Sequence, residues 1–600
     1  MLLRELRDHA RTRTDMPPLY YVPKALRWFI PLTENGDLAP GGLVDLRPAT
    51  GAKGPKGKLV PAPDAYRAGI HPPPLLLCDT AEYVLAVARD DSPKADAQAD
   101  RRCAAFVDLA RRWTDRAADH DPVARALARF LDADGLAHVP IPDDLVAADW
   151  VGIMVDAAWV HLRPTAQTEW CAIVAERKGG GRQGLCLVCG DHGNLLSTLP
   201  ESIKAGAIPT SGQARKTQLV SINSAAQARE GLLQLANTPI CDGCGSTGVA
   251  ALNALLADER HRRRGTTSSL VWWTRDPLDD DPIAAFDAPQ PDDVRHLLDT
   301  LHKPAHNRAA NERVDPNRFY SLTLGTNSSR VVVHDWIDIP IDELRRNQGA
   351  WFTDHETRDG WNRTSVWYPL WRLTQAAGRW DKTTNRYTNT LVPDGLDNAL
   401  LRSALNHQPP PAHLLAHLLG RIRSDRRVDG PRAALLRLIL ERSPHGGTTM
   451  PGLDPDATDP GYLCGRLFAL YESTQYAALS AVGENGRRQG VNATVADKFY
   501  GSATTAPRHV LLTLDRGSKA HLKRLRRDRP GTAVALGKQI GAVWARFDAT
   551  AEDVLPATLS PRQQARFALG YYHQQQSGFE AAAERAETKA AAAAADTRQP

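Results

Sequence analysis

Residues 443–461 read SPHGGTTMPGLDPDATDPG and separate two parts of the chain that differ in pattern. Glycine and proline punctuate this stretch, as is typical of a linker. Before it, strand-like and helix-like patterns both occur, whereas after it apolar residues recur only at helical spacings of three and four. The sequence therefore predicts an α+β fold, with a mixed α/β N-terminal region followed by an all-α C-terminal helical bundle.

The patterns on either side of the linker predict six segments. They are an N-terminal α/β domain over 1–150, a zinc-ribbon-like insertion over 151–260, a strand-rich part over 261–394, a helical connector and linker over 395–449, a helical bundle over 450–580 and a disordered, frayed tail over 581–600. A chain of 600 residues exceeds what one hydrophobic core usually organises, which agrees with several domains.

Local patterns refine this division. Within the insertion we expect a strand at WCAIVAE (170–176) and a glycine loop at KGGGRQG (178–184). Beyond it, β-branched and aromatic residues predict strands in SSLVWWTRDP (268–277) and FYSLTLGTNSSRVVVHDWIDI (319–339).

The overall composition points to the cytoplasm. The first residues, MLLRELRDHARTRTD, interrupt their apolar positions with charge, so they lack the core of a signal peptide. No stretch reaches the roughly 18 uninterrupted apolar residues of a membrane span, so we expect no membrane partner. A formal charge of +5 is too small over 600 residues to indicate a nucleic-acid partner, so the distribution of charge must decide that point.

Two C-x-x-C pairs, each followed by a glycine, predict a zinc site. The ligands are Cys186, Cys189, Cys241 and Cys244, and the glycines are Gly190 and Gly245. Two residues between thiolates let both sulfurs reach one tetrahedral ion, and glycine permits a tight turn. Because four sulfurs leave no position for water, the zinc would be structural. Two unrelated thiol pairs, or one redox pair, stay open as alternatives, since the 51 intervening residues exceed the usual zinc-ribbon loop.

The C-terminal part carries a basic helical face. Between Glu484 and Pro530 there are eleven Lys/Arg against four Asp/Glu, a local net charge of +7. Five cations share one face, namely Arg516, Lys519, Lys523, Arg526 and Arg527, and the opposite stripe consists of Leu511, Leu514, Leu522 and Leu525. Such a face tracks nucleic-acid phosphates without reading bases. A solvated helix surface is the alternative.

Two loops supply further candidate nucleic-acid contacts. They are Lys53, Lys56 and Lys58 in the first loop, and Lys204, Arg215, Lys216, Ser221 and Asn223 in the second. Solvated lysines and a turn-forming asparagine are the alternatives. The common phosphate-binding and hydrolase motifs do not occur, so we expect no catalytic centre.

Several segments in fixed order resemble the large subunit of the type I-C CRISPR surveillance complex, Cascade. They include YVPKALRWFIPL (21–32), CLVCGDHG (186–193), LVSINSAAQAREG (219–231), GYLCGRLFALYESTQYAAL (461–479) and RFALGYYHQQQ (566–576). The resemblance spans nearly the whole chain.

The resemblance implies a non-catalytic subunit that works in antiviral defence. Its implied partners are guide RNA, other Cascade subunits, target double-stranded DNA with its displaced strand, and a separate helicase-nuclease. Its implied roles are to recognise the protospacer-adjacent motif, assist duplex opening, stabilise the R-loop and recruit the helicase-nuclease. Thr80, in PPPLLLCDT, lies where relatives carry an asparagine-rich stretch, and it is therefore a candidate DNA contact.

The resemblance also implies that the C-terminal bundle is similar to the Cascade small subunit and is made separately from an internal start. Met450, one of only four methionines, falls in the linker at the place such a start requires. Two other interpretations remain: a stand-alone zinc-dependent nuclease, and a zinc-ribbon scaffold that binds only protein.

Overall fold

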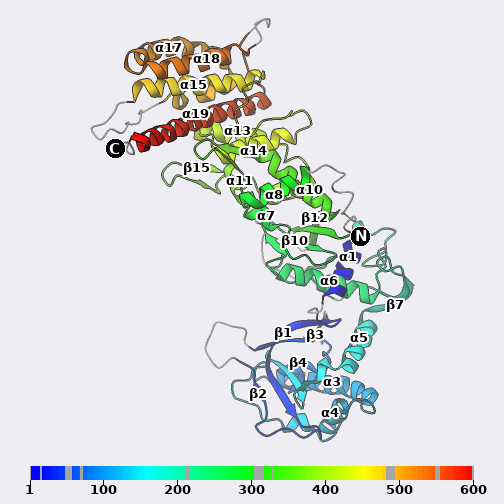
Figure 1. Ribbon diagram of the computed structural model, residues 1–600. Helices are drawn as coiled ribbons and strands as arrows, with labels where there is room; N and C mark the ends of the chain where they lie inside the picture. Colours follow the sequence, from blue (N-terminus) through cyan, green and yellow to red (C-terminus); the bar gives the residue numbers. More distant parts are fainter. Residues whose placement is uncertain are drawn as a thin grey trace. The chain divides into compact units, whose positions relative to one another are not determined.

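The computed structural model describes residues 2–13, 17–47, 57–65, 67, 72–199, 201–209, 217–265, 267–302, 316–327, 330–480, 494–547 and 554–596. The chain forms two compact units. The first comprises Met1–Asp276 and Tyr320–Trp336, and the second comprises Pro277–Phe319 and Ile337–Pro600. The mixture of helices and strands, with a helical C-terminal region, confirms the predicted α+β character (Figure 1).

A six-stranded sheet organises the start of the first unit. Its strands are β1 (Tyr21–Leu32), β2 (Val44–Asp45), β3 (Lys58–Pro63), β4 (Cys78–Thr80), β5 (Trp150–Val155) and β6 (Ala158–Trp159). The long strand β1 pairs antiparallel with β2 and β3 and parallel with β5, which in turn pairs antiparallel with β4 and β6. Strand β1 therefore lies at the centre of the sheet.

Three long helices and three short ones accompany this sheet. They are α3 (Pro93–Ala117), α4 (Pro122–Asp132) and α5 (Pro164–Lys178), with α2 (Ala81–Val84), η1 (Gly135–His138) and η2 (Val160–Leu162). The side chains of Ser92 and Asp121 cap α3 and α4, each followed by proline in the first turn. Buried Trp113 and Trp170 join the strands in one hydrophobic core.

The prediction of a strand at residues 170–176 is wrong, because these residues belong to α5. Trp170, Ile173 and Val174 recur at spacings of three and four, so they share the buried face of a helix. The prediction of a glycine loop at 178–184 is also wrong. Lys178 ends α5, and the remaining residues belong to β7 (Gly179–Leu185), which pairs antiparallel with β8 (His192–Leu196).

A second sheet in the first unit has the order β12-β11-β10-β9. Its strands are β9 (Arg262–Arg264), β10 (Ser268–Thr274), β11 (Arg318–Asn327) and β12 (Arg330–Pro340), so both predicted strand regions are confirmed. Trp273, Tyr320 and Trp336 stack across three of these strands, with ring centroids 5.4 to 5.7 Å apart. Helices α1 (Leu2–Thr12) and α6 (Asp242–Ala257) contribute to the same core, and η3 (Ala225–Gln227) lies in the preceding loop.

The second unit begins with helices and two small hairpins. They are α7 (Ala284–Asp287), α8 (Pro291–His302), α10 (Ile341–His355), β13 (Thr357–Asp359) with β14 (Thr364–Val366), α11 (Leu370–Ala376), β15 (Arg379–Asp381) with β16 (Arg386–Thr388), α12 (Leu396–Asn406), α13 (Leu414–Asp425) and α14 (Gly430–Glu441). Every residue of α14 from Gly430 to Leu440 is buried, so this helix forms the centre of the connector.

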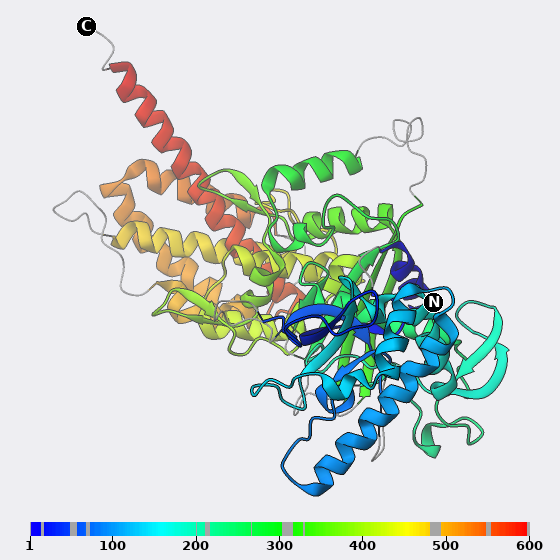
Figure 2. The ribbon, with the colours of Figure 1, turned by 90° about the horizontal axis from the view of Figure 1, so that it is seen from below.

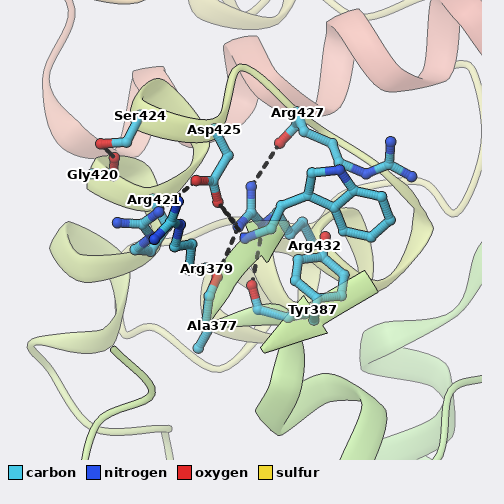
Figure 3. A network of polar contacts seen from close by, with 12 residues as sticks. Ala377, Arg379, Tyr387, Gly420, Arg421, Ser424, Asp425, Arg427 and Arg432 are labelled. Carbon is cyan, nitrogen blue, oxygen red and sulfur yellow. Dashed lines mark hydrogen bonds and ion pairs between the residues drawn. The ribbon is translucent and has the colours of Figure 1, made fainter. Parts of the chain in front are cut away.

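A network of buried charges joins α13 and α14 (Figure 3). Arg432 is 0% exposed, and its guanidinium donates to Asp425 at 2.5 Å and to the backbone oxygens of Ala376, Gly378 and Arg427 at 3.0 to 3.1 Å. Asp425 also accepts hydrogen bonds from Arg421 and from the backbone N–H of Trp380. The network therefore connects both helices to the backbone that precedes and begins β15.

The C-terminal bundle consists of α15 (Pro460–Leu479), α16 (Val495–Thr505), α17 (Pro507–Asp528), α18 (Pro530–Trp544) and α19 (Pro561–Asp596). Its core pair is α15 with α19, and glycines let the two backbones approach closely. A Cβ atom added at Gly465 would lie 2.0 Å from the carbonyl oxygen of Phe567, and one at Gly570 would lie 2.2 Å from that of Tyr462. Helix α19 also contacts α13 and α14 of the connector, and strand β13.

Helix α19 continues to Asp596 and extends past the other helices of the bundle at its C-terminal end (Figure 2). It therefore includes most of the segment 581–600 for which we expected a frayed tail, because its alanine-rich sequence has high helix propensity. Residues 597–600 lie outside the described part. No described helix is long and apolar enough to cross a bilayer.

Candidate metal centre and basic surfaces

The four cysteines of the two C-x-x-C pairs come together in the first unit. Cys186 and Cys189 lie in the turn between β7 and β8, Cys241 precedes α6 as its N-cap, and Cys244 lies in the first turn of that helix. All four sulfur atoms lie within 4.8 Å of one another. Within the described ranges they are the one group of His, Cys, Asp or Glu side chains arranged to hold a metal ion.

The spacing of the sulfur atoms fits a tetrahedral zinc ion. A Zn–S bond of about 2.3 Å gives a tetrahedron whose sulfur atoms are about 3.8 Å apart. The Sγ atoms of Cys189 and Cys241 are 3.8 Å apart. A shell of four thiolates is closed, so the ion would cross-link the β7–β8 hairpin to the start of α6 without an open position for water.

Hydrogen-bond donors favour the thiolate form of Cys186, whereas burial raises the pKa of Cys241 to about 11 and raises that of Cys244. Backbone N–H groups of Val188 and Cys241 donate to Cys186 Sγ at 3.4 and 3.2 Å. Burial raises the pKa of Cys186, but hydrogen bonds from backbone N–H groups, that of Cys241 foremost, lower it to about 7. The buried guanidinium of Arg7 on α1 donates to Cys244 Sγ at 3.8 Å. Because metal ligation requires thiolate, these donors suit a metal centre.

The two glycines serve different purposes. Gly190 has φ +80°, so it adopts the left-handed conformation expected for a tight turn. The same expectation is wrong for Gly245, which lies within α6. A Cβ atom there would approach Leu196 Cδ1 to 2.6 Å, so this glycine provides space for packing against β8.

The basic face predicted in the bundle lies on α17. Its five cations are all exposed, namely Arg516, Lys519, Lys523, Arg526 and Arg527. Leu511, Leu514 and Leu525 are buried on the other side, and Leu522 is half-buried. Lys519 lies 3.7 Å from Asp515, and Arg527 lies 2.8 Å from Asp528. The helix thus presents a row of positive charge, and its contact with nucleic acid stays a prediction.

The remaining predicted contacts are scattered over several loops. Lys53, Lys56, Arg215 and Lys216 lie outside the described residues. Exposed Lys58 begins β3, half-buried Thr80 ends β4, and Ser221 and Asn223 lie in the segment between β8 and α6. Exposed Lys204 lines a cavity together with residues that the sequence did not single out.

That cavity contains the functional candidates that sequence reasoning missed. Lys24, Asp64, Arg67, Glu201 and Asn253 line it, and they come from five separate places in the chain. No motif spacing connects them. The charged residue Lys24 within the mostly apolar strand β1 gave the only signal of a polar site.

Comparison with known proteins identifies a matching family. No curated protein matches the chain. The family described as CRISPR-associated protein (Cas_Csd1) matches residues 3–579, nearly the whole chain, including both cysteine pairs and the C-terminal bundle. The protein therefore belongs to the Cas_Csd1 family of CRISPR-associated proteins.

Proposed function

We propose that this protein is the large subunit of a type I-C CRISPR Cascade and performs no catalysis of its own. The observation that carries the proposal is the family match over residues 3–579, which includes every segment on which the resemblance to that subunit rested. Its partners would be guide RNA, the other Cascade subunits, target DNA and a helicase-nuclease, all in the cytoplasm.

We propose that the protein acts on target DNA. In RNA-guided recognition, pairing with the guide reads the sequence, while protein reads a short flanking motif and holds the backbone. We propose that the first unit recognises the protospacer-adjacent motif in the duplex and assists its opening. The described candidates for these contacts are Lys58, Thr80, Lys204, Ser221 and Asn223. Recruitment of the helicase-nuclease would follow the opening.

The bundle would stabilise the R-loop. Phosphates of a displaced strand are attracted by an exposed row of cations, and α17 presents such a row with leucines anchoring its opposite face. This contact is independent of sequence, as the displaced strand requires, because it differs from one target to the next.

The proposed metal would have a structural role. We propose structural zinc at the four cysteines, where it would hold β7 and β8 against α6. A stand-alone zinc-dependent nuclease is the rival function, and it needs an ion with an open coordination position near carboxylates. The closed set of four sulfurs supports the structural role instead.

The bundle is also proposed as a separate product. Met450 is 53% exposed and precedes α15, so initiation there would give a chain that contains α15 to α19 complete. In that product, the surface of α19 that contacts α13 and α14 in the full chain would be free to bind another subunit.

The salt dependence of DNA binding tests the proposed function. The Cascade is assembled with the wild-type chain or with Arg516→Gln, Lys523→Gln and Arg526→Gln combined, and its affinity for a matched target duplex is measured between 50 and 200 mM salt. The control combines Arg379→Gln, Lys382→Gln and Arg386→Gln, which removes the same charge from the exposed β15–β16 hairpin.

Each lost contact with a single-strand phosphate reduces the slope of log affinity against log salt by about 0.7. We expect the α17 variant to reduce the slope by about 2 and the control to leave it unchanged. Equal slopes for wild type and the α17 variant would contradict the role of this helix.

A further inference from the structure

A polar cavity of about 480 Å³ lies in the first unit. Its polar and aromatic lining includes Lys24 of β1, Trp150 of β5, Asp64 and Arg67 after β3, Glu201, Lys204, and Asn253 of α6. Binding pockets for small molecules have volumes of about 300–1,000 Å³, so the cavity suits a ligand of that size.

Glu201 is the most unusual residue of this cavity. It is 5% exposed, and its Oε1 atom has no hydrogen-bond partner among the described residues. Burial raises the pKa of this carboxyl to about 8, and the nearby charge of Asp64 adds to the shift, while Lys204, a hydrogen bond with the side chain of Asn253, and Lys24 oppose it. The Oε1 oxygen of this buried carboxyl lacks a donor, which costs stability, and a ligand that donates a hydrogen bond to it would remove that cost.

The position of Glu201 is fixed by its neighbours. Asn253 on α6 accepts a hydrogen bond from the backbone N–H of Lys204 at 3.1 Å and donates one to the carbonyl oxygen of Ser202 at 3.0 Å. The side-chain amide of Asn253 therefore fixes the backbone at Ser202 and Lys204, within the short loop that carries Glu201. A site held in this way is organised before its ligand arrives.

Three cations line the cavity, and two of them are paired with carboxylates. Lys24 Nζ lies 3.1 Å from Asp64 and 4.8 Å from the centroid of the Trp150 ring. Arg67 is paired with buried Asp79 at 2.7 Å. Lys204 is exposed and has no ion pair with any residue that the structure describes, so its charge remains available to an anion.

We propose that this cavity binds one unpaired nucleotide whose base carries an exocyclic amino group, with Glu201 accepting from the amino group and Lys204 facing the phosphate. The inference rests on the proposed function, because a strand of guide RNA or of opened target DNA would supply the nucleotide. The inference adds to the proposed function a site that is specific for one kind of base.

The chemistry of the cavity selects this ligand class. A nucleotide has an anionic phosphate at one end and hydrogen-bonding base edges at the other, which matches an exposed ammonium group and a buried carboxyl. Glu and Asp side chains accept hydrogen bonds from cytosine N4, whereas uracil has a carbonyl oxygen at the same position. Cytosine and uracil nucleotides are therefore nearly isosteric ligands that Glu201 should distinguish.

The test is calorimetric titration of the purified full-length protein with CMP, UMP and dCMP at a pH of about 8.5, above the pKa of Glu201 of about 8, where the carboxyl is mostly ionised and its ionised form only accepts hydrogen bonds. We expect CMP or dCMP to bind at least about tenfold more tightly than UMP, since a base with the wrong edge leaves the carboxyl unpaired. Tighter binding of CMP than dCMP would assign the site to RNA, and equal or tighter binding of dCMP would assign it to DNA.

Two variants make the result specific. Glu201→Gln should abolish the preference for CMP over UMP, and Lys204→Met should weaken both ligands equally. Lys94→Met is the control, because Lys94 is exposed on α3 and does not line the cavity. Circular dichroism confirms that each variant is folded.

Equal binding of CMP and UMP by the wild type, or no binding of any of the three at millimolar concentration, would overturn the inference. Its failure is distinct from failure of the proposed function, which is judged by whether the wild-type and Glu201→Gln chains enter the RNA-guided complex.

Discussion

Replacing Asp425 by alanine should open the connector of the second unit locally. The substitution leaves Arg432, which is 0% exposed, without its carboxylate, and the backbone carbonyls of Ala376 and Gly378 cannot neutralise the charge. Removing one partner of a buried ion pair costs about 3–5 kcal/mol. The cost should fall on α13 and α14, which the network joins.

Native-state hydrogen exchange is the suitable assay, because a chain with several domains has no single free energy of unfolding. We expect amides of α14 to exchange at least about 100-fold faster in Asp425→Ala than in the wild type, which corresponds to about 3 kcal/mol. The control is Arg423→Gln, an exposed position on the same helix as Asp425, where a change within about 0.5 kcal/mol is expected.

A double variant checks the cause. Asp425→Ala combined with Arg432→Met removes both charges, so it should cost less than the sum of the two single changes. If Asp425→Ala changes exchange in α14 by less than about fivefold, the charge of Arg432 is compensated by other means and our reasoning about this network is wrong.

Three further predictions follow from the same structure. Cys241→Ser should lower the zinc content of the purified protein, measured by mass spectrometry of the elements, whereas Cys171→Ser, outside the cluster, should not; equal zinc in both would exclude the proposed centre. Gly570→Ala should lower the melting temperature, because its Cβ meets the backbone of α15, whereas Gly578→Ala, in open space on the same helix, should hold or raise it; equal effects would contradict the close packing of α15 and α19. The carboxyl of Glu201 has a folded pKa of about 8, above its unfolded value, so the folded protein holds one more proton across that interval and loses stability as pH rises from about 5 to 8. The melting temperature of the wild type, relative to that of Glu201→Gln, should therefore decrease over this pH range. If the difference between the two melting temperatures did not change with pH, the raised pKa of this buried carboxyl would be contradicted.

Features that depend on a short, regular spacing of residues were predictable from the sequence. The C-x-x-C pairs predicted four sulfurs around one point because two intervening residues fix the reach of each pair, and the structure brings all four together. The basic face of α17 followed from offsets that place residues on one side of a helix, and the strands of the second sheet followed from their β-branched and aromatic residues.

Features that depend on tertiary contacts were not predictable. Residues 170–176 resemble a buried strand, yet Trp170 and Val174 pack as one face of a helix, and a short apolar run does not distinguish the two. The partners of Arg432 lie up to 56 residues away, and the cavity around Glu201 brings residues 24 and 253 together. These residues become neighbours only in the folded chain, so no spacing in the sequence indicates their contacts.

The most direct test of the central proposal is co-purification. The tagged full-length protein is expressed together with its neighbouring genes, and the recovered material is analysed by RNA sequencing and by intact mass spectrometry of every protein. The account predicts a short repeat-derived RNA, partner subunits, and a fragment that begins at or near Met450. Recovery of the protein alone, without RNA or partners, would contradict membership in an RNA-guided complex and would favour a zinc-ribbon scaffold instead.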